Sequence, residues 1–197
     1  MKSVFIGISG ASGAGKSTLC TSLQEKYPEQ VGLIQLDDYF KKRINVPKYA
    51  GHDNWDSPDA LRLDQLYDDL LELQKGNSVM IDTKNDKLNP AYKKTNERVS
   101  VEFQAKPIML VEGYLVLHDE RIRSLFETSI FLDINQLISW ERRVHFKNDA
   151  YLQDVILPMN RKFVEPTQEF AKHVIDVSEL SKDEVFQQVE DILNMKE

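Results

Sequence analysis

The stretch that decides the fold is Val4-Phe-Ile-Gly-Ile-Ser-Gly-Ala-Ser-Gly-Ala-Gly-Lys-Ser-Thr-Leu19. Residues 4–8 are apolar and rich in β-branched side chains, which is typical of a buried strand. The pattern Gly10-x-x-x-x-Gly15-Lys16-Ser17 follows directly, and an amphipathic helical pattern begins at Thr18. A strand, a glycine-rich loop and a helix in this order predict a phosphate-binding P-loop.

The composition of this loop suits a nucleoside triphosphate. Its glycines let the backbone wrap closely around phosphate oxygens, and the helix that follows adds its positive N-terminal end. Lys16 can reach the β- and γ-phosphates, and the Ser17 hydroxyl can ligate Mg²⁺. The predicted nucleotide-binding residues are Gly10, Ala11, Ser12, Gly13, Ala14, Gly15, Lys16, Ser17 and Thr18.

The composition of the whole chain favours a globular protein and excludes several classes. A net charge of -7 over 197 residues argues against a nucleic-acid-binding protein, since no broad basic excess faces phosphates. The single cysteine, Cys20, excludes an internal disulfide and suits a reducing compartment. No apolar run approaches the length of about 18 residues that a membrane span needs, and no signal peptide precedes the first strand. We therefore predict a cytoplasmic protein with no membrane partner.

Strands and helices are predicted to alternate along one domain, residues 1–197, which indicates an α/β fold with a parallel, doubly wound sheet. The predicted strands are residues 3–9, 31–36, 107–111, 129–132 and 173–177. The predicted helices are residues 17–26, 57–76, 119–126, 135–147, 152–171 and 182–194. Two further runs, 79–81 and 99–103, predict a small β-hairpin inserted beside the main sheet, within residues 78–104.

Carboxylates follow two of the predicted strands. In open α/β sheets, ligands bind at the carboxyl ends of the strands. Asp37 and Asp38 end the second strand, and because neighbouring side chains of an extended backbone point in opposite directions, one of them is expected to face the site. Glu112 ends the strand 107–111, where an acidic residue can hold the water shell of Mg²⁺. The Asn-Lys-x-Asp sequence that reads the base in switch GTPases is missing, which argues against that class.

Further motifs extend along nearly the whole chain: Gly7-Ile-Ser-Gly-Ala-Ser-Gly-Ala-Gly-Lys-Ser-Thr18, Asp37-Asp-Tyr-Phe-Lys41, Asn54-Trp-Asp-Ser-Pro-Asp-Ala60, Val111-Glu-Gly-Tyr114, Glu141-Arg-Arg-Val144, and Pro158-Met-x-x-x-Phe163 with Glu165-Pro166. In this order and spacing they resemble the uridine kinase-like small-molecule kinases, which include uridine-cytidine kinases and nicotinamide riboside kinases. The resemblance implies a P-loop kinase fold, with a five-stranded parallel sheet flanked by helices and a helical lid at about residues 142–162. It also implies Mg²⁺-dependent transfer of the ATP γ-phosphate to a primary hydroxyl, typically the 5′-hydroxyl of a ribonucleoside.

The resemblance also implies roles for individual residues. Asp37 matches the catalytic carboxylate, which accepts or orients the proton of the acceptor hydroxyl, and Asp56 matches the aspartate on the ribose hydroxyls. Ser17 and Glu112 match the magnesium positions, and Lys16 acts on the phosphates. The remaining residues expected to contact the substrates are Tyr39, Tyr92, Arg142, Arg143 and Arg161, with Arg143 in a catalytic role. A helix-capping role is the alternative for Asp37 and for Asp56.

Two departures from the family pattern leave the acceptor open. Many members carry another lid arginine three positions after the arginine pair, where this chain has Phe146, so Arg143, Lys147 or Arg161 remain candidates for lid chemistry. The hairpin lacks the Tyr-Asp-Phe segment and the histidine that accompany pyrimidine binding. Uridine, a nicotinamide riboside-like nucleoside and another hydroxylated metabolite therefore stay open as acceptors. An ATP-binding regulatory module without transfer activity is the alternative of another class, and a homo-oligomer is compatible with the resemblance.

Overall fold

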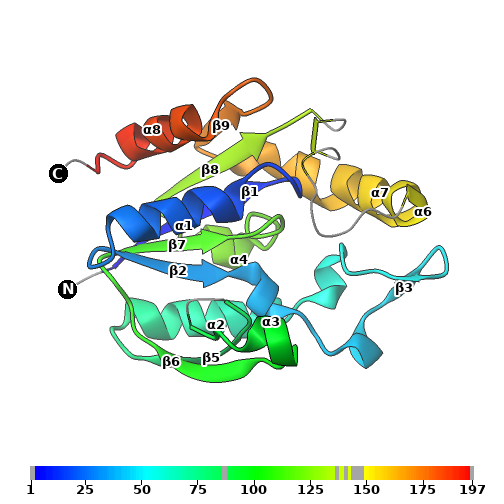
Figure 1. The fold of residues 1–197 in the computed structure, drawn as a ribbon, viewed down its shortest axis with the longest axis horizontal. Coiled ribbons are helices and arrows are strands. Elements are labelled where there is room, and N and C mark those ends of the chain that lie inside the picture. The colour runs from blue at the N-terminus through cyan, green and yellow to red at the C-terminus, as the bar shows by residue number, and fades with distance from the viewer. Residues whose placement is uncertain (1–2, 86–87, 136–137, 140–141, 143–148, 196–197) are drawn as a thin grey trace.

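The computed structural model describes residues 3–85, 88–135, 138–139, 142 and 149–195. A five-stranded sheet forms its centre, with the strand order β2-β7-β1-β8-β9 and all neighbours parallel (Figure 1). The strands are β1 (Val4–Gly10), β2 (Val31–Gln35), β7 (Ile108–Glu112), β8 (Thr128–Asp133) and β9 (His173–Asp176). The predicted parallel sheet is confirmed.

Helices cover both faces of the sheet, which explains why the strands are apolar on both sides. One face packs against α1 (Lys16–Lys26) and α8 (Lys182–Ile192), in a cluster that includes Ile6, Leu23 and Val189. The other face packs against α2 (Leu63–Gln74) and α4 (Glu120–Arg123), in a cluster that includes Phe5, Leu70 and Ile122. Successive residues of β1 thus enter opposite cores, as the alternation of side chains along a strand requires. Among the residues that the structure describes, no helix is long and apolar enough to span a membrane.

The predicted hairpin is present. Strands β5 (Val79–Thr83) and β6 (Val99–Phe103) pair antiparallel, with Val79 opposite Phe103, and form a separate two-stranded sheet. The connection between them contains the short helix α3 (Tyr92–Thr95). A second, smaller hairpin was not predicted: β3 (Lys48–Tyr49) pairs with β4 (His52–Asp53) in the polar loop after β2.

The continuous helix predicted for residues 57–76 is wrong. A 3₁₀ turn (Pro58–Ala60) comes first, and α2 begins only at Leu63. The Ser57 hydroxyl caps that turn alone, by accepting the N–H of Asp59 at 3.2 Å. The backbone between turn and helix bonds instead to the segment after β2, because the Lys41 N–H donates to Ala60 and the Arg62 N–H donates to Tyr39, both at 2.8 Å. Tertiary pairing therefore interrupts a helix that local caps would start.

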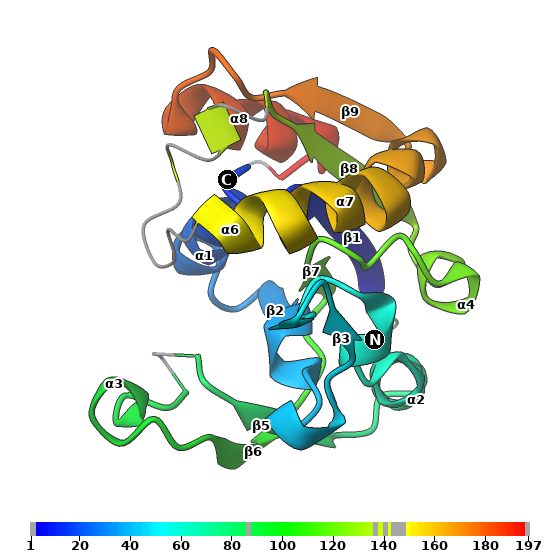
Figure 2. The ribbon, with the colours of Figure 1, turned by 90° about the vertical axis from the view of Figure 1, so that its right-hand side faces the viewer.

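The predicted helix 152–171 is found as one helical stretch of mixed geometry, residues 149–170. Its parts are α6 (Asp149–Tyr151), a π-helical turn (Leu152–Ile156), α7 (Leu157–Met159), a second π-helical turn (Asn160–Val164) and a 3₁₀ turn (Glu165–Phe170). Pro158 and Pro166 lie within it and lack the N–H that a regular α-helix would use. Figure 2 shows α6 and α7 crossing the end of the sheet near β3. Most of the predicted helix 135–147 lies outside the described residues.

Candidate active site

The P-loop connects the central strand β1 to α1, so its position is fixed by the middle of the sheet. Gly13 and Gly15 have φ angles of 89° and 90°, a left-handed region that glycine adopts readily. Lys16 is 8% exposed, and its Nζ donates to the carbonyl oxygens of Gly10 and Ala11 at 2.9 Å each. The ammonium group is therefore held within the loop that would surround a phosphate chain.

Ser17 and Glu112 meet beside this loop. The Ser17 hydroxyl donates to Glu112 Oε1 at 2.9 Å, and Gln35 Nε2 donates to the same oxygen at 3.1 Å. The Glu112 side chain is buried, which raises the pKa of its carboxyl; the charge of Lys16 opposes this shift and that of Asp37 adds to it. A hydroxyl and a carboxylate next to a phosphate-binding loop are oxygen ligands that Mg²⁺ accepts, directly or through water. These residues fit the predicted magnesium site.

Asp37 and Asp38 lie on a 3₁₀ turn (Leu36–Tyr39) rather than on an extended strand, and their surroundings differ. The Asp37 side chain is 45% exposed and pairs with Lys84 Nζ at 2.7 Å. Asp38 is buried and accepts hydrogen bonds from Thr83 Oγ1 at 2.7 Å, from the Lys84 N–H at 3.1 Å and from Arg98 Nη1 at 3.0 Å. Its pKa is raised by burial, although these bonds oppose the shift. Asp37 is thus the member of the pair that is accessible to an acceptor.

Asp56 belongs to the segment that connects the β3–β4 hairpin to the 3₁₀ turn before α2. Its Oδ2 accepts the hydroxyl of Tyr151, in α6, at 2.9 Å. The Tyr151 oxygen also accepts the Trp55 N–H at 3.2 Å, and the Tyr114 hydroxyl donates to the Trp55 carbonyl at 2.7 Å. Burial raises the pKa of Tyr114 well above its usual value, with the charges of Asp56 and Asp37 adding to the shift. Asp56 is therefore tied to the helical stretch 149–170.

The two tyrosines predicted to contact substrate lie in different places. Tyr39 is 1% exposed, and its hydroxyl donates to Asp69 Oδ2 in α2 at 2.9 Å, with a pKa raised by burial. This position in the core contradicts the expectation that Tyr39 contacts the acceptor. Tyr92 begins α3 and is partly exposed, and its N–H donates to the Asn89 carbonyl at 3.1 Å. A contact between Tyr92 and the acceptor therefore stays a prediction.

The structure describes two of the three predicted arginines, Arg142 and Arg161. Arg142 donates to the carbonyl oxygens of Val177 at 3.2 Å and Ser178 at 3.1 Å, so the structure places it against the chain that follows β9 rather than with the P-loop residues. Arg161 is exposed in the π-helical turn Asn160–Val164. Arg143 lies outside the described residues.

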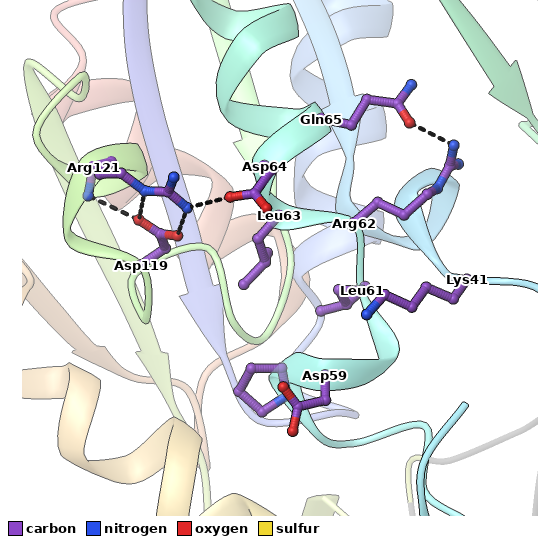
Figure 3. A pocket seen from close by; sticks show the side chains of 10 residues that line it. Lys41, Asp59, Leu61, Arg62, Leu63, Asp64, Gln65, Asp119 and Arg121 are labelled. Atoms are coloured by element: carbon purple, nitrogen blue, oxygen red, sulfur yellow. Dashed lines mark hydrogen bonds and ion pairs between the residues drawn. The ribbon is translucent and has the colours of Figure 1, made fainter. Parts of the chain in front are cut away.

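A pocket of about 510 Å³ lies apart from these residues, along the 3₁₀ turn Pro58–Ala60 and the start of α2 (Figure 3). Its charged groups are largely paired with one another: Arg121 Nη2 contacts Asp119 at 2.6 Å and Asp64 at 2.8 Å. Arg62 Nη1 donates to Gln65 at 2.6 Å. Of the predicted site residues that the structure describes, the lining contains none, so this pocket is distinct from the candidate active site.

Sequence reasoning missed four side chains that the site uses: Gln35, Lys84, Asn85 and Tyr151. Gln35 could have been found, because it ends β2 only two residues before Asp37 and beside the end of β7. The other three come from the hairpin insertion and from α6, and no motif marks them.

The comparisons with known proteins show the family of the chain. A model of the phosphoribulokinase / uridine kinase family matches residues 5–150. The uridine kinase of Clostridium novyi (strain NT) is 30% identical over 188 residues, which cover 89% of this chain and 88% of the relative. The uridine kinase of Chlamydia pneumoniae is 32% identical over 187 residues, which cover 89% of this chain and 82% of the relative.

A solved structure shows the same fold at lower sequence similarity. The structure of a possible uridine kinase from Bacillus stearothermophilus matches with a TM-score of 0.65 and 16% identity, over 89% of this chain and 90% of that chain. The family match covers most of the chain and includes the P-loop, Asp37 and Glu112. The chain therefore belongs to the phosphoribulokinase / uridine kinase family of P-loop kinases.

Proposed function

We propose that this protein transfers the γ-phosphate of ATP to a primary hydroxyl of a nucleoside-like acceptor, in an Mg²⁺-dependent reaction. The observation that carries the proposal is that a candidate metal site and an accessible carboxylate lie at the ends of two neighbouring strands, β7 and β2. The Ser17–Glu112 pair lies beside the P-loop at the end of β7, and the exposed carboxylate of Asp37 follows β2. One suits a metal–nucleotide complex and the other suits a hydroxyl nucleophile.

The chemistry requires positioning and charge neutralisation rather than a covalent intermediate. The acceptor oxygen forms a bond to the γ-phosphorus, the bond from that phosphorus to the β–γ bridging oxygen breaks, and ADP leaves with the bonding electrons. Asp37 accepts the hydroxyl proton or orients it, while Lys16 neutralises the phosphate oxygens. Ser17 and Glu112 would hold Mg²⁺, which supplies further neutralisation of the triphosphate when bound.

The acceptor class is supported by Asp56 and by the relatives. A carboxylate held by the Tyr151 hydroxyl suits recognition of vicinal ribose hydroxyls. The matched relatives are uridine kinases, which makes uridine the first acceptor to test. A nicotinamide riboside-like nucleoside is the second, since the hairpin lacks a histidine for a pyrimidine. The single buried cysteine suits a cytoplasmic enzyme of small-molecule metabolism.

The test is ADP release from Mg·ATP with a panel of acceptors: uridine, cytidine, adenosine, nicotinamide riboside, pantothenate and simple sugars. We expect strong stimulation by one nucleoside, and a fall in kcat of about 10²–10⁴-fold in both Asp37→Ala and Lys16→Ala. Asp68→Ala, an exposed aspartate of α2, is the matched control and keeps wild-type turnover. Tight ATP binding without stimulation by any acceptor would contradict the proposal and favour a regulatory ATP-binding module.

A further inference from the structure

We propose that Lys84 is a positioning residue for phosphoryl transfer, which holds the Asp37 carboxylate in place and offsets its charge next to the incoming γ-phosphate. The inference rests on the proposed function, because it takes Asp37 as the group that acts on the acceptor hydroxyl. Lys84 follows β5 and belongs to the hairpin insertion, 47 positions away from Asp37 in the sequence.

Lys84 contacts both members of the aspartate pair through different groups. Its Nζ lies 2.7 Å from Asp37 Oδ2, and its backbone N–H donates to Asp38 Oδ1 at 3.1 Å. The preceding residue, Thr83, donates to Asp38 Oδ2 at 2.7 Å and is 1% exposed. Because the Lys84 backbone is fixed by the buried Asp38, its side chain starts from a defined point and reaches Asp37 from there.

Arg98, the residue just before β6, fixes the other strand of the hairpin to the same turn. Its Nη1 donates to Asp38 Oδ1 and to the Asp82 carbonyl, both at 3.0 Å, and its Nη2 donates to the Asp37 carbonyl at 2.8 Å. The Arg98 guanidinium therefore bonds to the Asp38 carboxylate and to backbone carbonyl oxygens. Among the residues that the structure describes, Lys84 is the cation that contacts the Asp37 carboxylate.

The residue after Lys84 connects the hairpin to the magnesium side of the site. Asn85 Nδ2 donates to Gln35 Oε1 at 2.7 Å, and Gln35 Nε2 donates to Glu112 Oε1 at 3.1 Å. Two consecutive hairpin residues thus reach the two carboxylates of the candidate site, one directly and one through Gln35. This makes the hairpin part of the catalytic geometry rather than only a cover for the acceptor.

The charge of Lys84 has a physical role in such a reaction. A carboxylate that must stand next to a transferring phosphoryl group faces other negative charges, and one of them is Glu112 at the end of β7, the strand that pairs with β2. The Lys84 ammonium group on Asp37 Oδ2 reduces this repulsion and holds the Asp37 side chain in one rotamer. Both side chains are partly exposed, so water screens the effect and we expect it to be moderate.

The experiment compares Lys84→Met and Lys84→Arg with Lys94→Met, an exposed lysine of α3 in the same insertion. With the acceptor found in the panel, we expect kcat of Lys84→Met to fall about fivefold with the KM for ATP within twofold of wild type. Lys84→Arg recovers most of the loss, and Lys94→Met keeps wild-type kcat. A kcat of Lys84→Met within twofold of wild type overturns the inference, and so does a loss that Lys84→Arg does not rescue.

A double-mutant cycle separates positioning from folding. In the Asp37→Ala background, Lys84→Met should change the single-turnover rate by less than twofold, because its partner is already missing. A further loss of about fivefold in that background would overturn the inference. If Asp37→Ala itself keeps wild-type turnover, the role proposed for Asp37 fails and the inference about Lys84 fails with it, whereas the proposed function fails only if wild type shows no acceptor-stimulated ADP release. If Asp37→Ala is inactive and Lys84→Met is fully active, only the inference about Lys84 fails.

Discussion

The nucleotide half and the acceptor half of the candidate site are built in different ways. In the nucleotide half, the P-loop and Glu112 continue directly from β1 and β7, two neighbouring strands in the middle of the sheet. In the acceptor half, the β5–β6 hairpin, the segment around Asp56 and the helical stretch 149–170 lie outside the sheet. They are joined to one another mainly by single side-chain contacts, such as the one between Tyr151 and Asp56.

This difference separates two kinds of constraint. The position of the phosphates follows from backbone geometry that the whole core maintains, so it can change little without disturbing the sheet. The proposed acceptor site depends on a few hydrogen bonds between insertions, and these can be exchanged while the core persists. We therefore expect mutations in the nucleotide half to affect every acceptor equally, and mutations in the acceptor half to affect discrimination among acceptors.

Among the variants that test the difference between the two halves, the largest effect is expected from Gly13→Ala in the P-loop. Gly13 has a φ of 89°, and an added Cβ would lie 2.5 Å from the carbonyl oxygen of Ser139. We expect the loop to relieve this strain by changing its conformation. ATP binding must then restore the original conformation, and the energy this needs weakens the binding. Strain of about 2 kcal/mol corresponds to a rise of about 30-fold in the dissociation constant of Mg·ATP, measurable by calorimetry.

Gly51→Ala is the matched control for that experiment. Gly51 has a φ of 82° in the β3–β4 turn, and nothing lies within 4 Å of its added Cβ. It should lower stability slightly and leave ATP affinity unchanged. Equal ATP affinities of the two variants would contradict the role of Gly13 in the P-loop. An effect of Gly13→Ala that depends on the acceptor would show that the two halves are not independent.

Sequence alone predicted the strand, the loop and the helix of the nucleotide half because their determinants are local. The P-loop motif, the strand before it and the helix after it lie within residues 4–19, and each element supports the others. Glu112 was identified because it follows an apolar run that could only be a buried strand. The parallel sheet followed from the alternation of strands and helices, which is also a local pattern.

The acceptor half could not be predicted to the same extent, because its contacts join distant parts of the chain. Ser57 and Pro58 form a helix start by every local rule, yet pairing of residues 60–62 with residues 39–41 stops the helix after one turn. Tyr39 follows two accessible-looking aspartates, yet it turns into the core and bonds to Asp69. Lys84 and Tyr151 carry no motif, and only the fold brings them to their partners.

A smaller and more selective effect is expected from Tyr151→Phe in the acceptor half. The phenyl ring keeps its edge-to-face contact with His52, whose centroid lies 5.6 Å away, but loses the bonds to Asp56 and to the Trp55 N–H. Loss of a hydrogen bond to a carboxylate is worth about 1.5 kcal/mol, so the KM for the acceptor should rise about tenfold. Steady-state kinetics with both substrates varied measure this, and the KM for ATP should stay within twofold.

Tyr49→Phe, on an exposed tyrosine of the β3–β4 hairpin, is the control and should leave both KM values unchanged. A parallel rise in the KM for ATP would mean that the helical stretch 149–170 positions both substrates, and the two halves would then not be independent. A rise in the acceptor KM that differs among nucleosides would support the difference between the halves, because it would show that the contacts of Asp56 discriminate among acceptors.

The smallest effect on the reaction is expected from Glu190→Gln. This substitution changes the contact between α8 and α1, the helix that follows the P-loop. Glu190 Oε1 accepts from Lys26 at 2.7 Å and from the Tyr27 hydroxyl at 2.5 Å, and these bonds join α8 to the end of α1. The bond to Lys26 and then that to Tyr27 lower the pKa of the Glu190 carboxyl below its value in the unfolded chain. The resulting stability is therefore present above about pH 4.5 and is lost as the pH falls through the folded-state pKa.

At pH 7 we expect Glu190→Gln to lower the Tm by about 2–4 °C, with kcat and both KM values unchanged at 25 °C. The difference in Tm between wild type and variant should shrink as the pH falls below about 4.5, because protonated wild-type Glu190 loses the same charge. Thermal unfolding of both proteins between pH 3 and pH 7 measures this. A difference in Tm that grows toward acid pH would contradict the sign of the shift. An altered KM for ATP would show that the position of the P-loop depends on the packing of α8. The core would then not fix the nucleotide half as firmly as we infer.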